Sequence, residues 1–130
     1  MSVEQGFVSA FVAPAKRERW ATGLKNPKLR TKLLKQLWDA GRDWDPRHVT
    51  ALSSPGKRDE QITRIVDALR ARGAGSTVYV LTADGDSAGR EMPLIEAIEE
   101  FSDDGGALLI CGPCLALHLS ETGDPLLLSK

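Results

Sequence analysis

The spacing of hydrophobic residues changes in the middle of this chain, at Gly73 and Gly75. Before these glycines, apolar residues recur every three to four positions, which is typical of helices with one buried face. After them come short runs rich in β-branched residues and leucine, such as residues 77–82, and these favour strands. We therefore expect an α+β protein in which N-terminal amphipathic helices precede a β-α-β-β-β unit that forms one small mixed sheet.

Breaks in this spacing bound the expected elements, because proline and glycine interrupt helices. Helices are expected at residues 3–12, 16–24, 27–37, 59–72 and 91–101, and strands at residues 77–82, 107–110, 115–119 and 126–128. Residues 40–56 are expected to form a loop. The chain has 130 residues, which is enough for one core of ordinary size. We expect a single domain, residues 1–130, with a helical part (1–73) and an α/β part (74–130).

Composition is typical of a soluble protein. Apolar residues make up 42% and charged residues 27%, close to the average of globular chains. The longest stretch without charged or strongly polar residues, 107–117, spans 11 residues, whereas a membrane-spanning helix needs about 20. The first residues lack the basic start and apolar stretch of a signal peptide. We therefore expect a cytoplasmic protein that does not bind membranes.

Charge is unevenly distributed along the chain. The net charge is −1, but residues 16–35 hold eight lysines and arginines and one glutamate. Residues 84–124, in contrast, hold ten acidic residues and one basic residue. A domain built in this way has an electrostatic dipole that steers charged partners. The two regions also favour attraction between copies of the chain, so a homo-oligomer is one expected assembly.

The helix expected at residues 27–37 separates its charges from its leucines. At 100° per residue, Lys28, Lys32 and Lys35 lie within about 60° of one another. Arg30 is the one charged residue on the opposite side, where its aliphatic stem can lie along apolar surface. The leucines on that opposite side are Leu29, Leu33, Leu34 and Leu37.

The charge pattern favours a non-enzymatic binding or regulatory module that uses a basic helical face, because no complete set of catalytic residues accompanies it. Its partner is acidic, either a nucleic acid, whose phosphates attract lysine and arginine, or a protein. A solvated helix face is the alternative explanation of the same charges. No cofactor is expected for this function. The candidate partner-binding residues are Lys16, Arg17, Arg19, Lys25, Lys28, Lys32 and Lys35.

A second candidate site follows the strand expected at residues 77–82. Asp84 and Asp86 lie between this strand and the next expected helix, and paired carboxylates bind Mg²⁺. The run from Asp84 to Arg90 resembles the Asp-Gly-Asp-x-Ala-Gly-Arg motif of Toprim domains, in which the paired aspartates hold Mg²⁺. This resemblance implies the alternative function, a Mg²⁺-dependent phosphoryl-transfer or nuclease-like enzyme that uses Asp84 and Asp86.

Two observations bear on that alternative. Toprim domains also use a glutamate that directly follows an earlier strand, whereas this chain offers only Glu4-Gln5-Gly6, ahead of any expected strand. Acidic residues that cap the helix beginning near Glu91 would produce the same local pattern without a metal.

Cys111-Gly112-Pro113-Cys114 matches the C-x-x-C motif of thioredoxin-like oxidoreductases. Such proteins place the motif early in the domain, whereas 16 residues follow Cys114 here. A Gly-Pro turn between two strands explains the spacing, so both thiols are expected to be buried and structural. His48 and His118 lack the spacing of zinc ligands relative to these cysteines.

Residues 43–48 form a further candidate cluster. Asp43, Asp45 and His48 can be interpreted as metal ligands or as an acid/base group, although Asp45 before Pro46 also fits a helix N-cap. The three tryptophans, Trp20, Trp38 and Trp44, are expected to pack around the N-terminal helices.

Three runs, residues 11–19, 45–47 and 89–94, resemble small bacterial proteins of uncharacterised function. This resemblance spans most of the chain and implies no activity.

Overall fold

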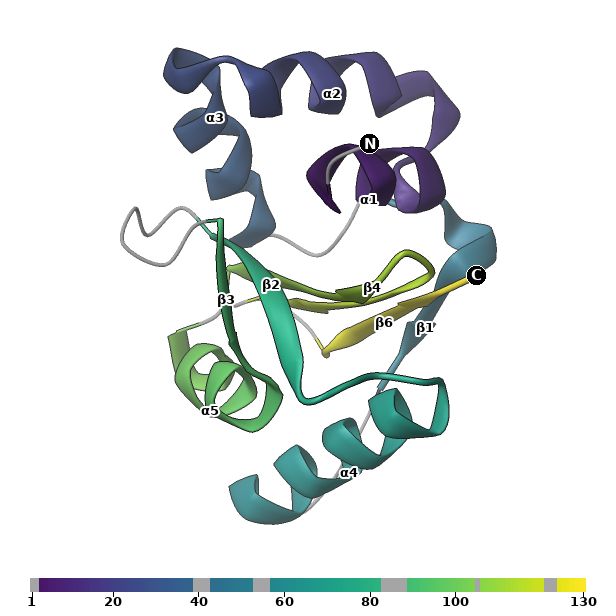
Figure 1. Cartoon of the computed structure of the whole chain (residues 1–130), viewed down its shortest axis with the longest axis vertical. Helices are drawn as coiled ribbons and strands as arrows, with labels where there is room; N and C mark the ends of the chain where they lie inside the picture. The colour runs from purple at the N-terminus through teal and green to yellow at the C-terminus, as the bar shows by residue number, and fades with distance from the viewer. Residues whose placement is uncertain (1–2, 39–42, 53–56, 83–88, 105, 121–123) are drawn as a thin grey trace.

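A computed structural model describes residues 3–38, 43–52, 57–82, 89–104, 106–120 and 124–130. One sheet lies between two groups of helices, with α1, α2 and α3 on one side and α4 and α5 on the other (Figure 1). The expected α+β class is therefore confirmed. None of the described helices combines the length and the hydrophobicity that a membrane-spanning helix needs.

The helices begin and end close to the expected positions. They are α1 (Val3–Phe11), α2 (Arg17–Lys25), α3 (Pro27–Leu34), α4 (Arg58–Ala71) and α5 (Leu94–Asp104). Asn26 caps α3, since its side chain accepts a hydrogen bond from the Lys28 N–H at 2.9 Å, and Pro27 occupies the first helical position. After Leu34 the chain continues as a 3-10 helix, η2 (Lys35–Trp38).

The sheet contains six described strands in the order β1-β6-β5-β4-β2-β3. They are β1 (Val49–Ala51), β2 (Thr77–Thr82), β3 (Arg90–Pro93), β4 (Ala107–Gly112), β5 (Leu115–Leu119) and β6 (Leu126–Ser129). Every neighbouring pair is antiparallel. The expectation of a mixed sheet is therefore wrong.

A strand that the sequence pattern misses explains this difference. β3 pairs antiparallel with β2 and reverses the chain before α5 begins at Leu94. The helix then connects β3 to β4, which run in the same direction, but β2 lies between them and is antiparallel to both. The expected helix from residue 91 accordingly begins three residues later, directly after Pro93.

β1 is a second missed strand. Residues 49–51, expected within a loop and within a helical half of the chain, pair with residues 126–128 of β6. Both β1 and β3 are short edge strands whose side chains are mostly exposed, so neither carries a run of buried hydrophobic residues that would signal a strand.

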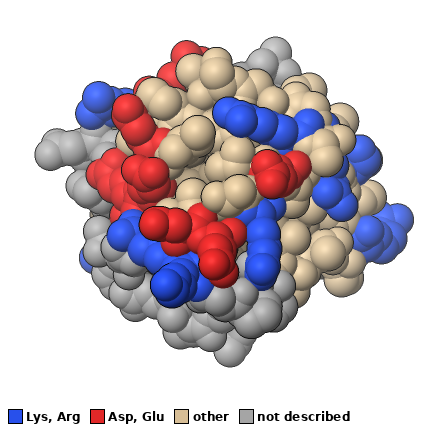
Figure 2. Space-filling view, turned by 90° about the horizontal axis from the view of Figure 1, so that it is seen from below, with Lys and Arg blue, Asp and Glu red and all other residues tan. Residues whose placement is uncertain are grey.

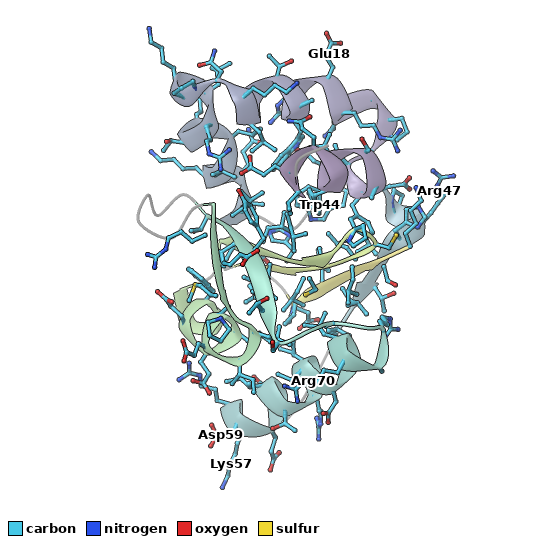
Figure 3. All side chains as sticks on the ribbon, in the orientation of Figure 1. Glu18, Trp44, Arg47, Lys57, Asp59 and Arg70 are labelled. Carbon is cyan, nitrogen blue, oxygen red and sulfur yellow. The ribbon has the colours of Figure 1, made fainter. Side chains whose placement is uncertain are left out.

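The sheet separates two hydrophobic cores. Leu81, Leu108 and Leu128 face α1, α2 and α3, whereas Val80, Leu109 and Leu117 face α4 and α5. All five residues of β5 are buried, as expected of a strand that helices cover on both faces. Trp44 lies between the N-terminal helices and the sheet (Figure 3), in the core that also contains Trp20. The predicted packing is confirmed for Trp20 and Trp44, while the Trp38 side chain lies outside the described residues.

Candidate functional site

The cations of residues 16–35 divide into two groups, and the first is engaged within the protein. Lys16 Nζ lies 2.7 Å from Asp43 Oδ1, and Arg19 Nη2 lies 3.8 Å from Asp43 Oδ2. Trp20 Nε1 donates to the same carboxylate at 2.8 Å. Burial raises the pKa of Asp43, but these hydrogen bonds and the charges of Lys16 and Arg19 outweigh burial, so its pKa is lowered overall. Arg17 Nε donates to the backbone carbonyl of Val12 at 3.0 Å.

Arg30 belongs to the same group. Its guanidinium pairs with both carboxylate oxygens of Glu4 on α1 and donates to the Leu24 carbonyl at 3.0 Å. Tyr79 on β2 donates its hydroxyl proton to the same glutamate. This network joins α1, α3 and the sheet, and it explains why Arg30 lies on the leucine side of α3.

The second group consists of lysines that extend into solvent. Lys25 ends α2, Lys28 and Lys32 lie one turn apart on α3, and Lys35 follows α3 directly. All four are exposed, and their side chains have no ion-pair or hydrogen-bond partner among the residues that the structure describes. Leu29, expected on the buried side, is instead 45% exposed beside these lysines. We call Lys25, Lys28, Lys32, Lys35 and Leu29 the lysine surface.

The lysine surface lies on the helical layer that covers the side of the sheet opposite α4 and α5, with α2 at its outer end and α3 running from α2 toward the sheet (Figure 1). The face seen from below, on the side of α4 and α5, carries acidic groups together with basic and apolar ones (Figure 2). Among the side chains of β3 and α5 that the structure describes, the exposed acidic ones are Glu91, Glu96, Glu99 and Glu100. Attraction between this face and the lysine surface of another copy remains a prediction.

Asp84 and Asp86, the candidate metal ligands, lie outside the described residues. The elements around them differ from the expected strand-to-helix turn, since β2 leads into the antiparallel strand β3. Among the described residues, no three histidine, cysteine or carboxylate side chains are grouped so that they could hold a metal ion. The Mg²⁺ site therefore stays a prediction from sequence, and capping of a helix at Glu91 is wrong because Glu91 lies in β3.

Gly89 of the same motif has a structural role. Its φ is +76°, a conformation that L side chains rarely adopt, and its N–H donates to the Val80 carbonyl at 2.7 Å. A Cβ atom at this position would lie 3.3 Å from the Tyr79 hydroxyl oxygen. The glycine therefore lets the chain enter β3 beside the Glu4–Arg30–Tyr79 network.

The cluster at residues 43–48 is divided between different partners. Asp43 pairs with Lys16, whereas Asp45 binds Arg47, with 2.7 Å between Asp45 Oδ2 and Arg47 Nη2. Asp45 also accepts from the Arg47 N–H and caps a short 3-10 helix (Pro46–His48), as the sequence indicates. These carboxylates therefore act in local structure, and the ring of His48 lies against Phe11.

His118 is a buried polar residue of β5, and the sequence indicates only that it lacks the spacing of a zinc ligand. Its Nδ1 accepts a hydrogen bond from Trp44 Nε1 at 2.9 Å, which leaves the proton on Nε2 for the Leu37 carbonyl, 2.7 Å away. The sequence feature that could have indicated a buried histidine is its position in an otherwise apolar strand, all of which is buried.

Cys111 and Cys114 flank the predicted turn between β4 and β5, and both are free thiols. The expectation that both are buried is wrong, because Cys114 is exposed and Cys111 is half-buried. Their positions follow from the turn, where β4 leaves the regular sheet through a register shift between Ile110 and Gly112. Burial raises the pKa of the Cys111 thiol to about 12, opposite to the lowered pKa of a redox-active cysteine.

The thiols are expected to react at very different rates with Ellman's reagent at pH 8. A pKa of about 12 in place of 9 leaves Cys111 with about a thousandfold less thiolate, so the rapid phase belongs to Cys114. Cys114→Ser should remove this phase and Cys111→Ser should leave it intact. Catalysed reduction of insulin disulfides by the wild type, lost in either variant, would contradict this assignment.

Searches of protein-family models, curated proteins and solved structures find no significant match to this chain.

Proposed function

We propose that this protein is a non-enzymatic binding module that engages a polyanionic partner through the lysine surface. The observation that carries the proposal is the contrast within residues 16–35. Lys16 and Arg19 share the carboxylate of Asp43 and Arg30 pairs with Glu4, whereas the four lysines of the lysine surface are exposed and unpaired among the described residues. The candidate set from sequence is thereby narrowed to Lys25, Lys28, Lys32 and Lys35.

Nucleic acid is the partner class that we favour. Ammonium groups contact phosphates without needing a fixed geometry, and several of them on one surface can follow a phosphate backbone. Several contacts hold the N-terminal helices in place. Arg30 on α3 pairs with Glu4 on α1, and Glu4 also binds Tyr79 of the sheet. Asp43 in turn pairs with Lys16. The lysines therefore project from a supported surface, which lowers the entropy lost on binding. An acidic protein is the second candidate, since Leu29 supplies an exposed apolar contact among the charges.

Replacing Lys28, Lys32 and Lys35 together by glutamine is expected to weaken binding to nucleic acid while leaving the protein folded. Each lost phosphate contact should lower the slope of log K against log salt by about 0.9 for duplex DNA or about 0.7 for single strands. The thermal midpoint should change by no more than about 2 °C, because exposed side chains away from packing contribute little to stability. The measurement is fluorescence anisotropy with duplex DNA, single-stranded DNA and RNA between 50 and 300 mM salt.

The matched control replaces Lys57, Arg72 and Lys130 by glutamine, which removes the same charge from exposed positions outside α2 and α3. Lys57 lies at the end of the molecule opposite α2 (Figure 3). Equal weakening by the two triple variants would mean that net charge alone governs binding, and the lysine surface would not be the site. If the wild type binds none of the three nucleic acids near 50 mM salt, the nucleic-acid proposal fails and acidic proteins become the partners to test.

A further inference from the structure

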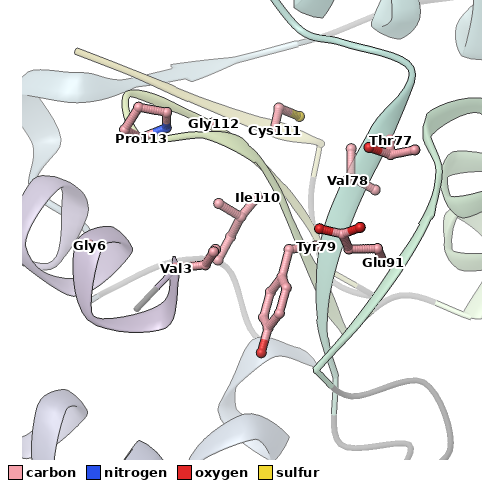
Figure 4. Close-up of a pocket in the computed structure, with 10 residues that line it drawn as sticks. All are labelled: Val3, Gly6, Thr77, Val78, Tyr79, Glu91, Ile110, Cys111, Gly112 and Pro113. Carbon is pink, nitrogen blue, oxygen red and sulfur yellow. The ribbon is translucent and has the colours of Figure 1, made fainter. Parts of the chain in front are cut away.

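A cavity of about 460 Å³ opens where β2 and β4 separate. The two strands pair from Thr82 to Tyr79, and β4 then shifts register and turns toward β5. The space between Thr77–Val78 and the β4–β5 turn is closed on a third side by α1 (Figure 4). The residues around it are mostly apolar and include Val3, Gly6, Ile110 and Pro113, together with Tyr79 and Glu91. Its size and lining are those of a small-molecule site.

Gly6 keeps this cavity open on the α1 side. It lies in the middle of α1, although glycine is the poorest helix former apart from proline. No neighbouring atom lies so close that only glycine fits, because a Cβ atom built at this position meets nothing within 4 Å. Its φ is also not in the left-handed region. A larger residue would therefore be accommodated by the helix and would project into the space that Gly6 lines.

Glu91 gives the cavity a negative charge. It lies opposite Tyr79 in the β2–β3 register, and its carboxylate is beside Tyr79 in Figure 4. The carboxylate is exposed and has no hydrogen-bond or ion-pair partner among the described residues. Glu4, the nearby carboxylate bound to Tyr79, is in contrast neutralised by Arg30. The ring of Tyr79 adds an aromatic surface, which attracts cations.

We propose that this cavity binds a small organic cation, an amine with an apolar body. The apolar body contacts Val3, Ile110 and Pro113, and the ammonium group pairs with Glu91 next to the Tyr79 ring. This site is separate from the lysine surface and does not depend on the function proposed for it.

The test compares three probes of similar shape and different charge: 2-phenylethylamine, 2-phenylethanol and 3-phenylpropionate. Two-dimensional ¹H–¹⁵N NMR of the ¹⁵N-labelled protein should show saturable shifts at Gly6, Tyr79, Ile110 and Gly112 with the amine. Because the ammonium–carboxylate pair is partly solvated, we expect the amine to bind about fivefold more tightly than the alcohol. The carboxylate probe should bind more weakly than either.

Gly6→Leu should reduce the affinity for the amine at least tenfold by filling the cavity, whereas Gly6→Ala should retain most of it. Both variants should melt at least as high as the wild type, because alanine and leucine favour helices over glycine. Glu91→Gln should remove the preference for the amine over the alcohol. Equal affinity for the three probes, shifts that lie elsewhere, no shifts at 10 mM amine, or unchanged binding in a folded Gly6→Leu variant would each overturn the proposal.

Discussion

Replacing Trp44 with alanine is expected to lower the free energy of unfolding by about 3–5 kcal/mol, a large share of the stability of an ordinary domain. The residue is 4% exposed. Its ring centroid lies 5.2 Å from that of Phe7, 5.1 Å from that of Trp20 and 5.4 Å from that of His118. The truncation therefore opens a cavity between the N-terminal helices and the sheet and also removes the hydrogen bond to His118.

Trp44→Phe separates these two effects. It keeps an aromatic ring in the core but leaves Nδ1 of His118 as a buried acceptor without its donor, which costs about 1–3 kcal/mol. Urea denaturation of both variants gives the comparison, and Leu29→Ala is the control for loss of an exposed apolar side chain. A Trp44→Ala variant with the denaturation midpoint of the wild type would show that Trp44 does not join the helices to the sheet.

The buried His118, which accepts the hydrogen bond from Trp44, predicts that the stability of the protein depends on pH. Burial lowers the pKa of His118, and the hydrogen bond to the Leu37 carbonyl only partly opposes this. The folded protein therefore keeps His118 neutral at pH values where the unfolded chain, with a pKa near 6.5, binds a proton. Stability should be fully present above pH 6.5 and should fall as the pH drops below that value. His118→Gln should remove this part of the pH dependence in urea titrations between pH 5 and 8.

The second large effect is expected at the Glu4–Arg30–Tyr79 network. Arg30→Met should cost about 2–3 kcal/mol, because it leaves the Glu4 carboxylate with 15% side-chain exposure and without its cation. Lys32→Met, on an exposed position of the same helix, is the control and should be nearly neutral. Adding Glu4→Gln to Arg30→Met should recover a large part of the lost stability, because the double variant no longer carries a Glu4 charge without a partner.

This network also contributes to acid sensitivity. Burial raises the pKa of Glu4, but the hydrogen bonds from Arg30 and Tyr79 together with the charge of Arg30 lower it overall. Its stabilising contribution should therefore be present above the unfolded pKa near 4.5 and be lost as the pH falls toward the lower folded value. An Arg30→Met variant that retained the wild-type stability at pH 7 and the wild-type acid transition would contradict this role.

Local sequence signals determined most of the elements. Asn26-Pro27 predicts the start of α3 because an amide side chain and a fixed φ satisfy the first turn of a helix without help from the rest of the fold. The apolar spacing of α4 and the runs of β2, β4 and β5 predict elements that the structure contains, since each places enough hydrophobic side chains on its buried faces. The angular position of Arg30 in α3 predicts that it lies on the leucine side, but its pairing with Glu4 was not predicted.

Contacts between distant segments decided the features that local sequence signals do not predict. β1 and β3 exist because β6 and β2 offer them backbone partners, and β3 by reversing the chain makes the sheet antiparallel. Sequence gives the sum of the charges in residues 16–35, but the partners of Lys16 and Arg30 lie 27 and 26 residues away. Trp44 and His118 are 74 residues apart. Folding therefore decides which lysines are unpaired among the described residues, which histidine stays neutral and where a cavity opens. These properties depend on distances between segments, and local sequence does not encode such distances.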